Sequence, residues 1–249
     1  MRKRILAALA GLLLLSVGCS ALSEQPVSEV VGERPFDTSI FTQGLEMQGD
    51  DLLVSGGQYG ESFAGIYSLV EEAVVSRVDL ADSFFGEGIT QAGDRILQLS
   101  WQEETLFIRD PVTLEEKGVH TYSGEGWGIA MGEDTLYMSD GTAEIRRLDP
   151  ETLEETGRVT VKETGTPVER LNELEYANGK LYANIWQTDD IVKIDPETGE
   201  VETRYTFLNL LTEEEQQTAD VLNGIAHIKD DRFYITGKWW PKLFEVILR

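Results

Sequence analysis

The sequence repeats one short phrase five times: FTQGLEM at 41–47, FGEGITQ at 85–91, EGWGIAM at 125–131, RLNELEY at 170–176 and LNGIAHI at 222–228. Each copy has a small or polar lead-in followed by an aliphatic residue. The aligned aliphatic residues are 44, 40, 45 and 51 positions apart, and they are Leu45, Ile89, Ile129, Leu174 and Ile225. A period of this length predicts a structural unit that recurs along the chain.

Two further phrases recur in register with the first. One comprises DDLLVSGG at 50–57, DRILQLSW at 94–101, DTLYMSDG at 134–141, GKLYANIW at 179–186 and DRFYITGK at 231–238; the other is an Asp-Pro turn at Asp110, Asp149 and Asp195. Alternating runs between them predict strands. Four strands in a unit of this length are typical of a propeller blade, so the sequence predicts an all-β, five-bladed β-propeller. Stacked β-sandwiches are the alternative, but they do not explain why the phrases recur in register.

The last repeat ends after three strands, so its fourth strand must come from elsewhere. The segment from Gln25 to Val31 is strand-like, and we expect it to close the ring by pairing with Leu243 to Leu248. A flexible linker is the alternative interpretation of this segment. Only the stretch from Leu211 to Ala219 looks helical, as an insertion that lengthens the last spacing.

The composition limits the possible partners. The chain has 249 residues, 41% of them hydrophobic, and a formal charge of −24 from 45 acidic and 21 basic side chains. A surface of this sign repels phosphate backbones, so no nucleic-acid partner is expected. One Cys and two His exclude a disulfide framework and leave little for a metal centre.

The first residues resemble a bacterial lipoprotein leader. Three basic residues precede an apolar run that is too short to span a bilayer, and small residues then lead to Cys19, the only cysteine. We expect residues 1–18 to be a signal peptide, residues 19–35 a tether and closing strand, and residues 36–249 the propeller domain. The protein would be an exported monomer, lipid-anchored to the cell envelope through Cys19 and facing the periplasm or the exterior. Ordinary secretory cleavage is the alternative.

Unlike residues stand at equivalent positions of the repeats. In a blade, the start of the first strand and the end of the second share one face of the disc. At these positions stand one carboxylate, three carboxamides, one ammonium group and three indoles: Glu87; Gln43, Asn172 and Asn223; Lys238; and Trp101, Trp127 and Trp186. Phe41 and Phe85 precede two of them by two residues. A repeated scaffold with variable polar and aromatic positions predicts a small cavity with a few directed polar groups.

Burial among aromatic rings is expected to raise the pKa of Glu87, which suits proton transfer near neutrality. Other polar residues have simpler interpretations. We expect Glu173 and Glu175 to be solvated or paired with Arg170, and Asn223 to cap a turn. His120 and His227 are interpreted as ordinary hydrogen-bonded histidines rather than metal ligands.

The motifs together resemble those of the glutamine cyclotransferase family, the metal-free glutaminyl-peptide cyclotransferases of plants and bacteria. They are FTQGL at 41–45, FFGEGIT at 84–90, LSW at 99–101, GWG at 126–128, SDGT at 139–142, LNELEY at 171–176, NIW at 184–186, LNGIA at 222–226 and TGKWW at 236–240. The resemblance implies a five-bladed propeller that converts an N-terminal glutamine of peptides to pyroglutamate and releases ammonia, without metal or cofactor.

The same resemblance implies the site residues. Glu87 would be the acid and base, Gln43, Asn172 and Lys238 would hold the polar groups of the substrate, and the apolar walls would be Phe41, Phe85, Trp101, Trp127 and Trp186. The residues alone leave two alternatives. A metal-dependent propeller hydrolase, such as a lactonase, would use oxygen ligands from Glu87, Asn172 and Asn223. A binding module would only present the surface of the propeller.

Overall fold

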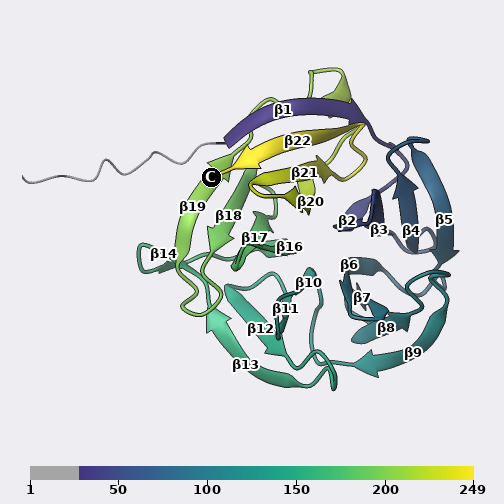
Figure 1. Cartoon of the computed structure of the whole chain (residues 1–249), viewed down its shortest axis with the longest axis vertical. Helices are drawn as coiled ribbons and strands as arrows, with labels where there is room; N and C mark the ends of the chain where they lie inside the picture. The colour runs from purple at the N-terminus through teal and green to yellow at the C-terminus, as the bar shows by residue number, and fades with distance from the viewer. Residues whose placement is uncertain (1–27) are drawn as a thin grey trace, which may run out of the picture.

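The computed structural model describes residues 28–249, which form five antiparallel four-stranded sheets around a central axis (Figure 1). The leader and Cys19 lie outside the described residues. The predicted all-β, five-bladed propeller is confirmed, and the innermost strand of each blade is the one that carries the first repeated phrase. No helix within the described part of the chain is long and apolar enough to cross a membrane.

Each blade runs from the axis outward. Blade 1 contains β2 (Thr42–Gln48), β3 (Asp51–Gly56), β4 (Phe63–Ser68) and β5 (Ala73–Asp79); blade 2 contains β6 (Gly86–Ala92), β7 (Arg95–Ser100), β8 (Thr105–Arg109) and β9 (Glu116–Thr121). Blade 3 contains β10 (Ile129–Met131), β11 (Leu136–Ser139), β12 (Glu144–Leu148) and β13 (Glu155–Thr160); blade 4 contains β16 (Leu171–Ala177), β17 (Lys180–Ile185), β18 (Asp190–Ile194) and β19 (Val201–Thr206). A small hairpin of β14 (Lys162–Glu163) and β15 (Thr166–Pro167) lies between blades 3 and 4.

Blade 5 joins the two ends of the described chain. It contains β20 (Leu222–Lys229), β21 (Arg232–Gly237), β22 (Lys242–Leu248) and, as its outer strand, β1 (Ser28–Pro35). The pairing of β1 with β22 runs from Ser28 opposite Leu248 to Pro35 opposite Lys242. The predicted closure is therefore confirmed, and it covers an edge of β22 that would otherwise be free to pair with another chain.

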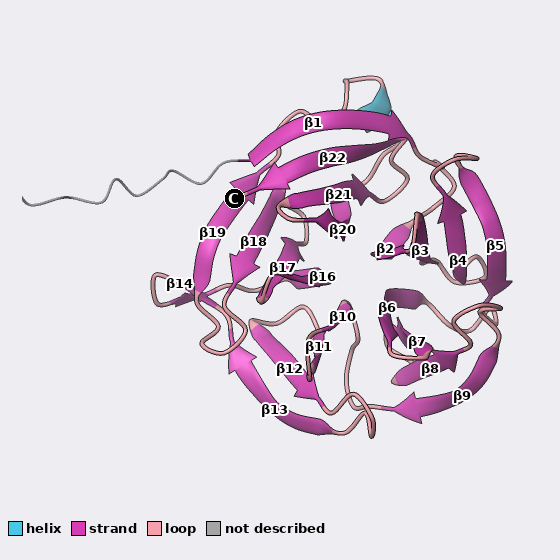
Figure 2. Cartoon of the chain, viewed as in Figure 1, coloured by secondary structure: helices cyan, strands magenta, loops and turns pink. Residues whose placement is uncertain are grey.

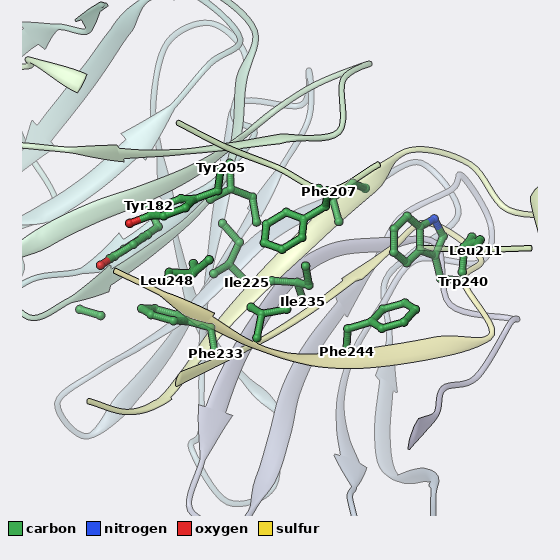
Figure 3. Close-up of a cluster of buried hydrophobic side chains, with 14 residues drawn as sticks. Tyr182, Tyr205, Phe207, Leu211, Ile225, Phe233, Ile235, Trp240, Phe244 and Leu248 are labelled. Atoms are coloured by element: carbon green, nitrogen blue, oxygen red, sulfur yellow. The ribbon is translucent and has the colours of Figure 1, made fainter. Parts of the chain in front are cut away.

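The hydrophobic core lies between neighbouring blades. The middle strands are buried on both faces, whereas outer strands such as β5 alternate between exposed and partly buried residues. The cluster between blades 4 and 5 is rich in aromatic side chains, including Tyr182, Tyr205, Phe233 and Trp240 (Figure 3). Packing of this kind holds each blade against the next and fixes where the inner strands end.

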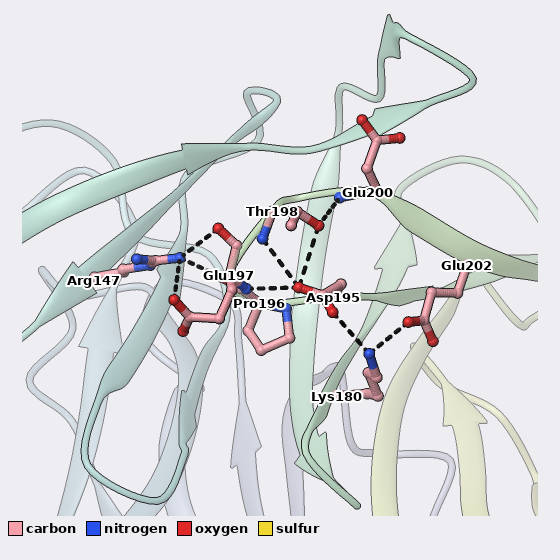
Figure 4. A network of polar contacts seen from close by, with 8 residues as sticks. All are labelled: Arg147, Lys180, Asp195, Pro196, Glu197, Thr198, Glu200 and Glu202. Atoms are coloured by element: carbon pink, nitrogen blue, oxygen red, sulfur yellow. Dashed lines mark hydrogen bonds and ion pairs between the residues drawn. The ribbon is translucent and has the colours of Figure 1, made fainter.

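The Asp-Pro turns have the predicted chemistry and also connect the blades. In blade 4, the Asp195 carboxylate accepts hydrogen bonds from the backbone N–H groups of Glu197 and Thr198, both at 3.0 Å (Figure 4). The carbonyl of Pro196 accepts a hydrogen bond from Arg147 of blade 3. The turn that ends one blade's third strand is thus a contact point for the preceding blade.

The insertion before β20 differs from its prediction. Between Leu211 and Ala219 the chain forms only one 3₁₀ turn, Glu215–Gln217, instead of a helix (Figure 2). Thr212 and Glu215 bond to each other where the turn starts: the Glu215 carboxylate accepts the Thr212 N–H at 2.8 Å, and the Glu215 N–H donates to Thr212 Oγ1 at 3.3 Å. The turn ends early because the chain has to reach blade 5, where the Asp220 N–H donates to the Lys238 carbonyl at 2.8 Å.

Candidate active site

Bulges at the start of the inner strands create the site. The pairing register shifts near the first residues of β2, β6, β16 and β20, at Thr42/Gly44, Gly86/Ile89, Leu171/Leu174 and Leu222/Ile225. A bulge leaves one residue unpaired and re-aims its side chain. The residues inside these four bulges include Gln43, Glu87, Asn172 and Asn223, the polar set that the repeats predict for one face of the disc.

A cavity of about 280 Å³ lies among these residues, at one end of the central channel. Its lining comprises Phe41, Gln43, Phe85, Glu87, Trp101, Trp127, Asn172, Trp186, Asp220 and Lys238. All nine residues predicted for the site within the propeller therefore line one cavity. The volume is near the lower end of the ~300–1,000 Å³ typical of small-molecule pockets, so the cavity suits a single amino-acid residue.

Glu87 is the central acid of the cavity. Its side chain is buried, and Oε1 accepts a hydrogen bond from Gln43 Nε2 at 2.9 Å. Oε2 is buried and has no partner among the described residues. Burial raises the pKa of Glu87 well above its usual range, and the positive charge of Lys238 opposes that rise. The acid is thus poised to exchange a proton with a group that enters the cavity.

Lys238 is the cation of the cavity and belongs to the junction of blades 5 and 1. It follows β21, forms an isolated bridge with Phe41, and places its Nζ 4.7 Å from the centre of that ring. Burial lowers the pKa of Lys238, while the charges of Glu87 and Asp220 raise it. Within residues 28–249, Lys238 and Glu87 form no ion pair at 4.0 Å or less, and both line the same cavity.

A short relay of hydrogen bonds orients Glu87. Asn223 Nδ2 donates to the Thr42 carbonyl at 2.9 Å and to Gln43 Oε1 at 3.3 Å. Gln43 in turn donates to Glu87, so its amide is engaged at both ends. The sequence analysis predicted that Asn223 caps a turn, but its side chain instead bonds to the neighbouring blade 1.

A second acceptor in the cavity is unpaired. Asn172 is buried, and its Oδ1 has no hydrogen-bond partner within the described chain. Its backbone carbonyl accepts a hydrogen bond from Ser139 Oγ at 2.6 Å, which fixes the residue against blade 3. A buried polar atom without a partner costs free energy, so Asn172 Oδ1 and Glu87 Oε2 together favour a ligand that donates hydrogen bonds.

Aromatic rings form the walls. Phe41 contacts Phe85 edge to face with 6.1 Å between ring centres, and Phe85 contacts Trp101 at 5.7 Å. On the other side, Trp127 and Trp186 contact each other at 5.5 Å. Such walls exclude water and strengthen electrostatic interactions inside the cavity.

Glu125 connects the two walls, and no motif in the sequence pointed to it as a site residue. Its carboxylate accepts hydrogen bonds from the indole N–H groups of Trp101 at 2.8 Å and Trp127 at 2.9 Å. Desolvation raises its pKa, but the bonds from Trp127, Gln102 and Trp101 outweigh this and leave the pKa lowered. Glu125 therefore remains charged and holds both rings in place.

In the channel below the cavity, Glu173 and Glu175 differ from the expectation that they are solvated or paired with Arg170. Glu173 is buried, with Oε2 accepting the Ile225 N–H at 2.9 Å and Oε1 the Leu45 N–H at 3.3 Å. Glu175 accepts the His227 N–H at 3.1 Å. Neither glutamate pairs with Arg170. The acidic side chains turn inward because inner strands have unpaired N–H groups along the channel, and these groups need acceptors.

Residues that could bind a metal ion do not cluster in the part of the chain that the structure describes. Across residues 28–249, no group of three or more His, Cys, Asp and Glu side chains is arranged to hold a metal ion. In the cavity, the oxygens of Glu87 and Asn172 lie in the same lining as the Lys238 ammonium group, which would repel a cation.

The fold and the cavity define a class of protein: a β-propeller that gathers one buried acid, one buried amine and aromatic walls at the mouth of its channel. The sequence model that describes the glutamine cyclotransferase family matches residues 5–248 of this chain. The chain belongs to that family, as its motifs suggested.

Individual relatives agree. The chain is 38% identical to an Arabidopsis thaliana glutaminyl-peptide cyclotransferase over 227 residues, which cover 89% of this chain and 71% of the relative. The crystal structure of Myxococcus xanthus glutaminyl cyclase is 36% identical, with a TM-score of 0.80 over 90% of this chain and 97% of that one. The WD40 β-propeller domain of Doa1, at 8% identity and a TM-score of 0.50, covers 81% of this chain and 62% of its own, and shares the fold alone.

The partly buried carboxyls of Glu46 and Glu175 predict how stability depends on pH. Burial raises the pKa of Glu46 to about 7, and it raises the pKa of Glu175 well above its usual range. A raised folded-state pKa stabilises the fold below the unfolded pKa of about 4.3, and this contribution is lost as the pH rises through the folded pKa. Urea unfolding of wild type should therefore give a lower free energy of unfolding at pH 8 than at pH 5.

The variant Glu175→Gln should lose part of that difference, because it removes one titrating group and the charge that faces Glu46. Glu71→Gln, at an exposed position, is the matched control and should keep the wild-type difference. An equal change between pH 5 and pH 8 in all three proteins would contradict the interpretation.

Proposed function

We propose that this protein is a glutaminyl-peptide cyclotransferase, which converts the N-terminal glutamine of peptides and proteins to pyroglutamate and releases ammonia. The observation that carries the proposal is the unpaired Oε2 of Glu87, buried in a one-residue cavity that Lys238 also lines. The names of the relatives support the same activity.

The reaction is an intramolecular acyl transfer. The neutral α-amine attacks the side-chain amide carbon of the same residue, and a new C–N bond closes the ring. The amine proton passes to Glu87 Oε2, which then delivers it to the departing amide nitrogen; the C–N bond to that nitrogen breaks, and ammonia leaves. The α-amine has an ordinary pKa of about 7.7–8, so a neutral fraction is present near pH 7.

The other polar groups have complementary roles. The ammonium of Lys238 stabilises the negative oxygen that develops on the amide carbonyl. Asn172 Oδ1 accepts an N–H of the substrate. Gln43 lines the cavity, but its engagement with Asn223 and Glu87 makes orientation of the acid its main role. The aromatic walls hold the substrate in a folded conformer, which reduces the entropy cost of ring closure.

One assay distinguishes the cyclotransferase from the two alternatives, a metal-dependent hydrolase and a binding module. Ammonia release from an N-terminal glutamine peptide, measured with and without EDTA, separates them. Activity that survives EDTA supports the cyclotransferase. Loss of activity with EDTA supports a metal-dependent hydrolase, and a folded protein that releases no ammonia supports a binding module.

Replacing Glu87 with Gln tests the assignment of the acid. The variant Glu87→Gln has nearly the same shape but cannot take up a proton, so kcat should fall by roughly 10²–10⁴-fold, the usual contribution of general acid–base catalysis. Calorimetry should still detect binding of a peptide with N-terminal glutamine. Full activity in Glu87→Gln would refute the proton-transfer role.

Lys238 can be tested through the pH profile. In Lys238→Met, kcat should fall by about 10²–10³-fold, as when an oxyanion donor is lost, and more than KM rises. Because the positive charge of Lys238 lowers the pKa of Glu87, its loss should move the acidic limb of kcat/KM to higher pH. A variant with reduced kcat and an unshifted limb would show that the two groups are not electrostatically coupled.

We also propose that the protein is exported as a monomeric lipoprotein, anchored in the cell envelope through Cys19 and exposed to the periplasm or the exterior. The basic and apolar leader before Cys19 supports this. The variant Cys19→Ser should move from the membrane fraction to the soluble fraction while ammonia release per mole is retained. A wild-type protein already in the soluble fraction would contradict the anchor.

A further inference from the structure

A second cavity adjoins the active-site cavity. It has a volume of about 340 Å³ and lies between the loop that follows β17 and the insertion at 207–221. Asp220 lines both cavities, and Gln187 of the second directly follows Trp186 of the first. The cavities near Arg34, Arg146 and Arg204 share no lining residue with the active site.

Asp220 is held firmly at the border between the two cavities. Its N–H donates to the Lys238 carbonyl at 2.8 Å, and its carbonyl accepts the Trp240 indole N–H at 2.7 Å. Its carboxylate accepts the Val221 N–H at 2.7 Å. Asp220 therefore separates the two cavities as a polar residue that its hydrogen bonds hold in place. The other walls of the active site are aromatic rings in mutual contact.

The second cavity has an apolar floor and acidic sides. Phe207, Leu211 and Trp240 are buried members of the core cluster between blades 4 and 5, and Leu211 and Trp240 lie at one end of it (Figure 3). Leu208, at 65% exposure, offers an apolar side chain to solvent. Asp189 and Asp220 supply carboxylates, and no Lys or Arg of the described chain lines this cavity.

We propose that this second cavity binds the peptide residues that follow the N-terminal glutamine, and that it selects apolar or basic side chains against acidic ones. The inference rests on the proposed function. The active-site cavity has room for one residue, so the following residues of a bound peptide must lie outside it. Asp220 lines both cavities, so the second cavity is in reach of those residues. The apolar floor favours an aliphatic side chain. The Asp189 carboxylate has no ion-pair partner among the described residues, so it favours a positive charge and repels a negative one, whereas the charge of Asp220 is partly offset by Lys238.

The test compares a substrate without downstream residues with peptides that have them. The substrates are glutamine amide and the amidated tripeptides Gln-Leu-Leu, Gln-Lys-Lys and Gln-Glu-Glu. Wild type should have a kcat/KM for the leucine and lysine peptides about three- to tenfold above that for the glutamate peptide, the range of exposed charge interactions.

Asp189→Lys reverses one charge of the second cavity without touching the active site. It should raise kcat/KM for Gln-Glu-Glu, lower it for Gln-Lys-Lys and leave glutamine amide unchanged. Asp94→Lys, an exposed position in the turn between β6 and β7 at the opposite end of the inner strand, makes the same change in net charge and should leave the order of the peptides as in wild type.

Leu208→Ser is a second variant and should selectively lower kcat/KM for Gln-Leu-Leu, with the exposed Val112→Ser as its control. Equal effects of Asp189→Lys and Asp94→Lys, together with no effect of Leu208→Ser, would overturn the subsite while the cyclotransferase stands. A wild-type protein that converts neither glutamine amide nor any of the three tripeptides would overturn the proposed function itself.

Discussion

The close approach of the inner strands around the channel is the constraint on which the rest of the structure depends. A Cβ at Gly44 would lie 2.6 Å from the backbone nitrogen of Ile89, and one at Gly88 would lie 2.7 Å from that of Ile129. At these positions the next blade is too near for any side chain. The fourth copy has Glu173 instead of glycine, and its carboxyl fills the channel and accepts N–H groups from blades 5 and 1. A ring this tight leaves little room between the inner strands, so their polar side chains lie in the channel or at its mouth.

The electrostatics of the site follow from that geometry. Glu87 and Lys238 are both buried, and burial disfavours the charged form of each. Each charge offsets part of the desolvation of the other, but they form no close ion pair in the described structure. A direct ion pair would fix both groups in their charged forms. Separation keeps the acid able to gain and lose a proton, and under the proposed mechanism the substrate would lie between the acid and the cation.

The fold and most of the site could be predicted from the sequence because both follow from the repeated phrases. Framework positions recur, and the positions that vary, such as Glu87 and Lys238, are those that face the channel mouth. Asp220 could not be found in this way, because it lies in an insertion that has no counterpart in the other blades. Glu173 and Glu175 were misjudged because a local pattern does not show which backbone N–H groups a closed ring leaves without partners. Those N–H groups, not solvent, determine where the two carboxyls point.

The residues proposed for ring closure and those proposed for selecting downstream peptide residues lie in different parts of this fold. The acid, the amine and the aromatic walls lie on or directly beside inner strands that packing and bulges hold in place, so their geometry tolerates little change. The second cavity is bordered by the loop after β17 and by the insertion before β20, outside the repeated framework. Under the proposed assignment, substitutions there would alter contacts with the downstream residues of a peptide and leave the relay through Gln43 to Glu87 intact. A rigid centre beside an adjustable loop allows the same ring closure to serve different peptides.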